Sequence, residues 1–234
     1  MTSKTKRFIV SVTISVGLLL PLNWVFADTA SVKQLSAEWW QWALSIPTSE
    51  NPLLDTTGEA CMVGQRGTTW FLGGVFGVGE TTRTCSVPEG TVLFFPIANS
   101  VFFDSPNVCQ GPESYPITVM RAAVAAFVDG VTNIVVEVDG KAIGNIQRVG
   151  RSLVYPIALP EENVFDAPCA PDNVPAGIYS PTVDDGLYVR LNPLAVGNHT
   201  LHFHTENPGN PNTPDDDFFQ DITYHLTVVP VVRR

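Results

Sequence analysis

Residues 200–204 (Thr-Leu-His-Phe-His) and 222–228 (Ile-Thr-Tyr-His-Leu-Thr-Val) decide the fold class. In both stretches apolar and polar residues alternate with a period of two, which is the pattern of a β-strand with one buried face. Antiparallel sheets commonly show it because one face packs on the core and the other faces water. We therefore expect Leu201 and Phe203 to point inward and the neighbouring histidines to point outward.

Other short stretches of the sequence also have patterns typical of β-strands. Residues 134–138 and 187–191 alternate in the same way, and apolar runs at 69–72, 83–87 and 91–97 lie between Gly, Pro, Asn and Asp. Short strands separated by turn residues predict a mainly β protein, an antiparallel β-sandwich of the immunoglobulin-like or jelly-roll-like kind. No Gly-rich nucleotide motif and no βαβ rhythm is present, so a Rossmann-type fold is not expected.

Two helices are predicted to accompany the strands. Residues 35–46 contain three of the five tryptophans, and Trp39 and Trp42 fall on one apolar helical face. Trp40 lies off that face and is the candidate for an exposed ring in a ligand platform, for example for sugars. A further helix is predicted around 117–128, where apolar residues again follow the helical period.

The first 27 residues have the pattern of a secretory signal peptide. Three basic residues precede an uncharged apolar run over 8–22, which ends in Val25-Phe26-Ala27. We expect cleavage after Ala27, and the alternative is an uncleaved anchor. Residues 28–234 would then form a single exported domain, secreted or periplasmic, that includes the N-terminal helical segment. No other stretch has the length of a bilayer span, so no transmembrane span is expected after cleavage.

The cysteine count agrees with export. Cys61, Cys85, Cys109 and Cys169 are the four cysteines of the chain, and an even number in a secreted protein indicates disulfides. Three pairings are available, of which we favour the sequential one, Cys61–Cys85 with Cys109–Cys169. A thiolate metal site is the alternative, but no Cys-x-x-Cys motif supports it.

Composition limits the class of partner. Hydrophobic residues make up 44% of the chain and charged residues 15%, so the sequence can form a core and is not a disordered acidic chain. The formal net charge of −10 lacks the basic footprint that nucleic-acid binding requires. The partners that remain are a small molecule, a glycan or a protein.

Four motifs can be compared with known families. They are Trp-Trp-Gln-Trp-Ala (39–43), Cys-Met-Val-Gly-Gln-Arg-Gly with Trp-Phe-Leu (61–67, 70–72), Arg-Thr-Cys-Ser-Val-Pro-Glu-Gly with Leu-Phe-Phe-Pro (83–90, 93–96), and Gly-Asn-His-Thr-Leu-His-Phe (197–203). In these motifs the chain resembles a family of secreted bacterial proteins of unknown function. The resemblance spans nearly the whole mature chain and implies an exported β-sandwich, but no reaction.

The histidines are the sharpest candidate for chemistry. His202 and His204 share one face of a predicted strand, and His225 falls on the solvent face of the last strand. If the two strands pair, three imidazoles could approach one another and suit zinc or copper. The alternative is a polar, solvated sheet face, because the sequence does not fix the register.

A second candidate is the polar loop that ends in Asp215, Asp216 and Asp217, whose carboxylates could hold calcium. Its spacing does not match an EF-hand, and a solvated loop is the alternative. Gln65, Arg66 and Asn99 would also be of interest if a cleft formed beside them.

No nucleophile or metalloprotease motif is present, so enzymatic activity stays uncertain and we lean against it. The first functional hypothesis is an exported, non-catalytic protein that binds a ligand or has a cell-surface or periplasmic role. The alternative is a metal-dependent enzyme or metal-binding protein that uses the His-rich C-terminal strands.

Overall fold

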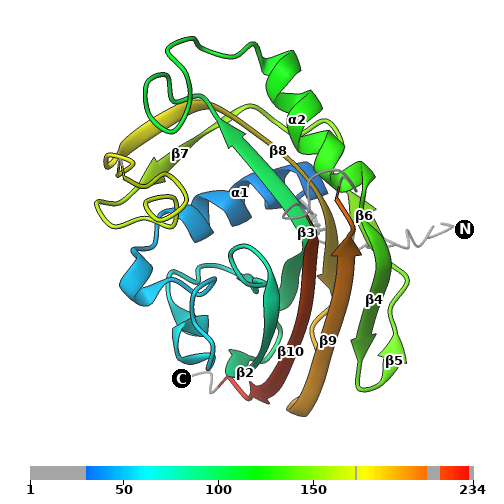
Figure 1. Cartoon of the computed structure of the whole chain (residues 1–234). Coiled ribbons are helices and arrows are strands. Elements are labelled where there is room, and N and C mark those ends of the chain that lie inside the picture. Colours follow the sequence, from blue (N-terminus) through cyan, green and yellow to red (C-terminus); the bar gives the residue numbers. More distant parts are fainter. Residues whose placement is uncertain (1–29, 172, 210–216, 232–234) are drawn as a thin grey trace, which may run out of the picture.

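The structure is a computed structural model that describes residues 30–171, 173–209 and 217–231 (Figure 1). The predicted signal peptide lies outside these residues. The described part is mainly β, with two five-stranded sheets packed together in a sandwich-like arrangement and two α-helices.

The first sheet is built around two long strands. Its order is β1 (Thr69–Phe71), β3 (Val92–Phe103), β8 (Gly177–Leu191) and β6 (Ile146–Arg148), and β7 (Tyr155–Leu159) pairs with the other half of β8.

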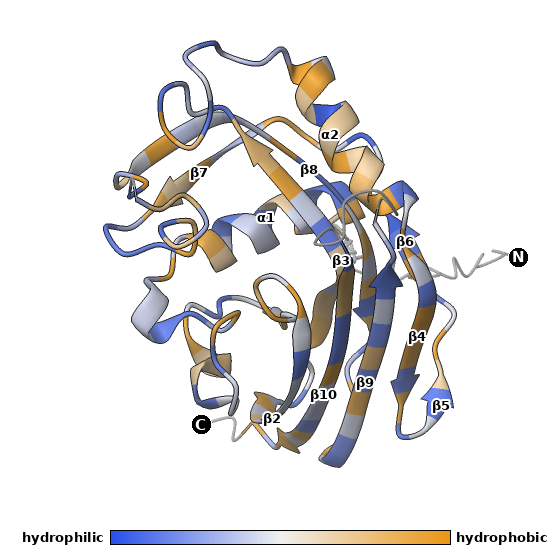
Figure 2. Ribbon diagram, viewed as in Figure 1, coloured by the Kyte–Doolittle hydropathy of each residue, from blue (hydrophilic) through white to orange (hydrophobic). Residues whose placement is uncertain are grey.

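The second sheet contains the two stretches that decided the fold class. Its order is β2 (Gly79–Pro88), β10 (Phe218–Val229), β9 (Gly197–Asn207), β4 (Thr132–Val138) and β5 (Lys141–Ala142). The predicted pairing of β9 with β10 is confirmed, and it is antiparallel. Figure 2 shows the alternation of polar and apolar residues along both strands.

The predicted sandwich of two packed sheets is confirmed, but the prediction that the sheets are antiparallel is wrong, because two strand pairs are parallel and both sheets are mixed. β1 pairs with β3, and β2 pairs with β10, in parallel. The turn at Glu89-Gly90 carries the chain from the second sheet to the first, so β2 and β3 do not form a hairpin. β2 instead pairs with the last strand of the chain.

The main core lies between the two sheets. Leu201 and Phe203 are fully buried there, as predicted, and the ring of Phe203 stacks on Phe95 of β3 at 5.3 Å. The other residues of this core come from β1 to β4, β8 and β10, with the cystine of η2 (Glu59–Met62) at one end: Cys61, Trp70, Leu72, Cys85, Val87, Leu93, Ile97, Val136, Val138, Val189, Leu191, Ile222, Tyr224, Leu226 and Val228.

The N-terminal helix forms a third layer. It spans α1 (Val32–Leu44), slightly earlier than the predicted 35–46, and Ser31 caps it by accepting a hydrogen bond from the backbone of Gln34. A short helix η1 (Thr48–Glu50) follows. α1 packs on the face of the first sheet that the sandwich leaves uncovered. Tyr188 on β8 is therefore fully buried, although the alternation at 187–191 predicted a solvated face there.

The second predicted helix is confirmed as α2 (Ile117–Asp129), which covers the far ends of β3 and β8. Met120 and Val124 of α2 pack on Val183. Both predicted disulfides, Cys61–Cys85 and Cys109–Cys169, are present. Two disulfides are typical of proteins from an oxidising extracellular compartment. No described helix is long and apolar enough to cross a membrane.

Candidate functional site

The predicted histidine cluster lies on the outer face of the second sheet. The register places Asp221 opposite His204, and its carboxylate contacts His202 Nε2 at 2.9 Å and His204 Nδ1 at 3.2 Å. His204 Nε2 also faces Glu206 Oε1 at 3.2 Å. These imidazoles are thus engaged with carboxylate oxygens of their own sheet.

His225 is exposed on the same outer face, paired in register with Thr200, and it borders a shallow depression near His199. Within the described residues, no group of three or more His, Cys, Asp or Glu side chains is arranged to hold a metal ion. The zinc or copper hypothesis therefore has no support from this face.

The predicted calcium loop stays a prediction. Asp215 and Asp216 lie outside the described residues. Asp217 is described, and it is exposed directly before β10.

The prediction that Trp40 is an exposed ring is wrong. Only 5% of Trp40 is exposed, and it packs edge-on against Trp39, with ring centroids 4.9 Å apart. Its burial follows from the position of α1, which has the first sheet on one side and the following loops on the other. Trp40 nevertheless lines a cavity, so it can still contact a ligand that enters the protein.

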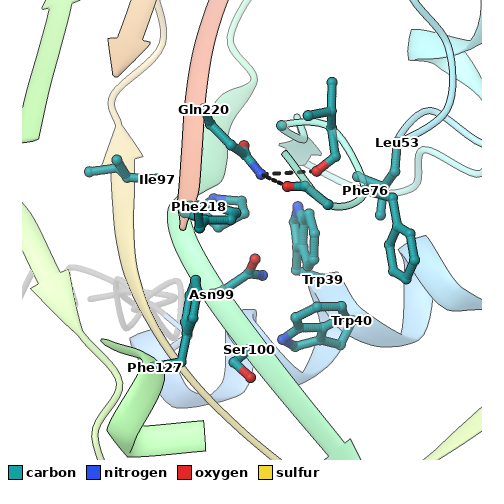
Figure 3. Close-up of a pocket in the computed structure, with 14 residues that line it drawn as sticks. Trp39, Trp40, Leu53, Phe76, Ile97, Asn99, Ser100, Phe127, Phe218 and Gln220 are labelled. Carbon is teal, nitrogen blue, oxygen red and sulfur yellow. Dashed lines mark hydrogen bonds between the residues drawn. The ribbon is translucent and has the colours of Figure 1, made fainter. Parts of the chain in front are cut away.

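This cavity has a volume of about 180 Å³ and lies where α1, β3, α2 and β10 meet. Figure 3 shows Trp39 and Trp40 on one side, Phe127 and Phe218 on the other, and Asn99 between them. The complete lining is Trp39, Trp40, Leu53, Gly74, Val75, Phe76, Gly77, Pro96, Ile97, Asn99, Ser100, Phe127, Phe218 and Gln220.

The loop that follows β1 forms one wall of the cavity. Gln220 Nε2 donates to the carbonyl of Val75 at 2.9 Å, and the side chain passes so close to Gly74 that a Cβ there would lie 1.7 Å from Gln220 Oε1. Glycine at position 74 is therefore required for this approach.

A buried arginine also binds the backbone of this loop. Arg83 is 1% exposed, and its Nη1 donates to the carbonyls of Gly73 and Gly74 at 2.7 and 3.0 Å. It also donates to the hydroxyl of Tyr224 at 2.8 Å and, through Nε, to the carbonyl of Asp55 at 2.7 Å. The guanidinium fork suits this task because its donors diverge in one plane.

A β-bulge directs Asn99 toward the cavity. Leu93 and Phe95 face the sandwich, and simple alternation would place Asn99 on the same side. The register with β8 shifts between Pro96 and Ala98, so Asn99 instead shares a face with Tyr188 and donates from Nδ2 to its hydroxyl at 3.2 Å. Bulges often re-aim side chains next to functional sites.

The other two polar candidates, Gln65 and Arg66, do not line this cavity. Gln65 is held by backbone groups, with hydrogen bonds to the carbonyls of Cys61 and Phe71, which is the turn-stabilising alternative. Arg66 borders a more open depression of about 540 Å³ beside α1, together with Glu38.

Every side chain that lines the cavity is uncharged. The lining thus contains no carboxylate, imidazole or ammonium group that could transfer a proton at neutral pH. Five aromatic residues provide apolar area, and the polar side chains are Asn99, Ser100 and Gln220. Apolar walls with a few fixed polar groups are typical of small-molecule binding sites.

Behind the cavity, β8 carries a buried acid that sequence patterns did not identify. Asp184 is fully buried and accepts a hydrogen bond from the Tyr155 hydroxyl at 3.1 Å, while its Oδ2 has no partner among the described residues. Burial raises the pKa of Asp184 to about 7. Burial also raises the pKa of Tyr188, further along the same face, well above its usual value.

Sequence reasoning missed most of the cavity. Phe127, Phe218 and Gln220 come from segments that are remote in sequence, and each is an ordinary strand or helix residue in its own local pattern. The packing of α2 on β3 and β8 and the pairing of β10 in the second sheet bring these three residues to the same place.

Comparison with known proteins adds no assignment. No protein-family model matches the chain, and no curated protein is significantly similar to it.

Proposed function

We propose that this is an exported, non-catalytic β-sandwich protein that binds one small, uncharged molecule in the cavity between α1, β3, α2 and β10. The observation that carries the proposal is the uncharged, aromatic lining. Moving a charged ligand into such a site would cost several kcal/mol of desolvation that no group of the lining could offset.

Export is supported by the signal-like first 27 residues and the two disulfides. The family resemblance described above supports a bacterial source, and the signal-like N-terminus supports a periplasmic or secreted location. A role in binding also agrees with the cavity size. A volume of about 180 Å³ exceeds the roughly 150 Å³ of an engineered protein cavity that holds benzene.

The proposal is tested with toluene and benzoate, which share a ring and differ in charge. We expect toluene to bind the purified mature protein in ligand-observed NMR and to quench its tryptophan fluorescence, and benzoate to do neither. Ser100→Leu places a larger, apolar side chain in the lining, reduces the cavity volume and should weaken toluene binding strongly. Thr223→Leu adds the same apolar side chain on the outer sheet face and should bind toluene normally. Failure of toluene to bind, or its equal binding to Ser100→Leu, would refute the proposal.

A further inference from the structure

The polar atoms that line the cavity also indicate which hydrogen-bonding group the ligand carries. Asn99 Nδ2 uses one of its two N–H groups on the Tyr188 hydroxyl, and Oδ1 is the acceptor that this amide offers to the cavity. The described residues supply no donor to Oδ1, and the atom is not sealed from solvent, unlike Trp40 Nε1. In Figure 3 the amide of Asn99 lies between the tryptophans and the phenylalanines.

A carbonyl oxygen at this place recognises a hydrogen-bond donor. Trp39 and Trp40 on one side and Phe127 and Phe218 on the other leave space for a flat or chair-shaped ring between them. A ring with one hydroxyl or N–H group would place its apolar faces against the aromatic walls and its donor on Asn99.

Resting on the proposed function, we infer that the ligand class is single-ring alcohols of the phenol type, bound through a hydroxyl that donates to Asn99 Oδ1. Tyr188 is the positioning residue, because the hydrogen bond that its hydroxyl accepts from Asn99 Nδ2 holds the amide in this orientation.

A sugar fits this cavity less well, although the aromatic rings suggest one. Both side-chain amides of the lining already use an N–H group inside the protein, Asn99 on Tyr188 and Gln220 on Val75. A monosaccharide has several hydroxyl groups, and each one left without a partner costs about 1–3 kcal/mol. A ligand with one polar group avoids that cost.

The experiment compares phenol, anisole, toluene and glucose on the mature protein. Phenol can donate and accept, anisole can only accept, and toluene can do neither. We expect phenol to bind about tenfold more tightly than toluene, anisole to bind like toluene, and glucose not to bind.

Two variants locate the effect. Asn99→Leu should remove the preference for phenol while toluene still binds, which shows that the variant is folded. Tyr188→Phe releases the amide, so the preference of phenol over anisole should fall severalfold. Asn198→Leu, on the exposed outer face, is the matched control and should keep the wild-type order.

The outcomes separate this inference from the proposed function. Equal binding of phenol, anisole and toluene overturns the inference but leaves a ligand-binding cavity. Equal binding of phenol and anisole above toluene also overturns it, since the amide N–H would then face the ligand. Preferential glucose binding overturns the ligand class, and absence of any binding overturns both proposals.

Discussion

Replacing Asp184 with asparagine should make the protein less sensitive to rising pH. The carboxyl is fully buried on β8, and burial raises its pKa from an ordinary value of 3.8 to about 7. Between these two values the unfolded chain has lost the proton of Asp184 while the native protein keeps it. Because the native state then binds more protons, stability falls as pH rises.

The size of the effect follows from the same two pKa values. The complete difference corresponds to about 4 kcal/mol, of which about 2–3 kcal/mol develops between pH 5 and pH 8. The Tyr155 hydroxyl donates to this carboxyl, but the desolvation by burial outweighs the hydrogen bonds that favour the ionised form. Asp184→Asn keeps the shape of the side chain and removes the ionisation.

Urea unfolding of the disulfide-intact protein at pH 5 and pH 8 measures this directly. Relative to wild type, Asp184→Asn should gain about 2–3 kcal/mol of unfolding free energy on going from pH 5 to pH 8. Glu161 is exposed, so Glu161→Gln removes an acid that is not buried. Its unfolding free energy should change between pH 5 and pH 8 by the same amount as that of the wild type. If the unfolding free energy of Asp184→Asn changes between pH 5 and pH 8 by the same amount as that of the wild type, the carboxyl is already ionised at pH 5 and the argument from burial is wrong.

Three further perturbations test the support of the cavity and the outer face. Arg83→Lys cannot satisfy the carbonyls that the guanidinium holds, so thermal unfolding should show a loss of at least about 3 kcal/mol; an unchanged stability would contradict this. Gly74→Ala forces Gln220 away from its present position, and should cost about 1–3 kcal/mol and weaken toluene binding, which fluorescence titration checks. His199 donates to the Asp139 carboxylate at 2.8 Å, which raises the pKa of the imidazole. The stability from this pair is complete below the unfolded pKa of about 6.5 and is lost as pH rises through the folded value. In an NMR titration, Asp139→Asn should lower the pKa of His199, and an unchanged value would show that Asp139 is not the cause.

Local sequence patterns predicted the structure correctly where only one face of a strand or helix packs on the core. The alternation around Leu201 and Phe203 correctly predicted a strand and the face that is buried, because only one side of β9 packs on the core. The helical period predicted both helices in the same way, whereas the disulfide pairing was favoured only as the sequential one of three possible pairings. The same logic failed at Tyr188 and Trp40, because α1 adds a third layer that no local period reveals.

The cavity itself could not be predicted, since it depends on register and on the end of a strand. β1 pairs with β3 only as far as Phe71 and Phe94, and Gly73-Gly74 then turns the chain away from the edge of β3. The next part of β3, from Pro96 to Ser100, therefore has β8 on one side and no strand of the described chain on the other.

An uncovered strand edge is a risk for a β protein, because its free N–H and C=O groups can pair with another chain. Here Pro96 removes one donor, the bulge after it interrupts the ladder, and α1, Phe127 and Phe218 surround the rest. These features protect the edge without filling it. The cavity of about 180 Å³ lies beside this edge of β3, in the place that a longer β1 would have occupied, and aromatic rings enclose it. We therefore expect ligand binding and protection of this edge to depend on the same residues.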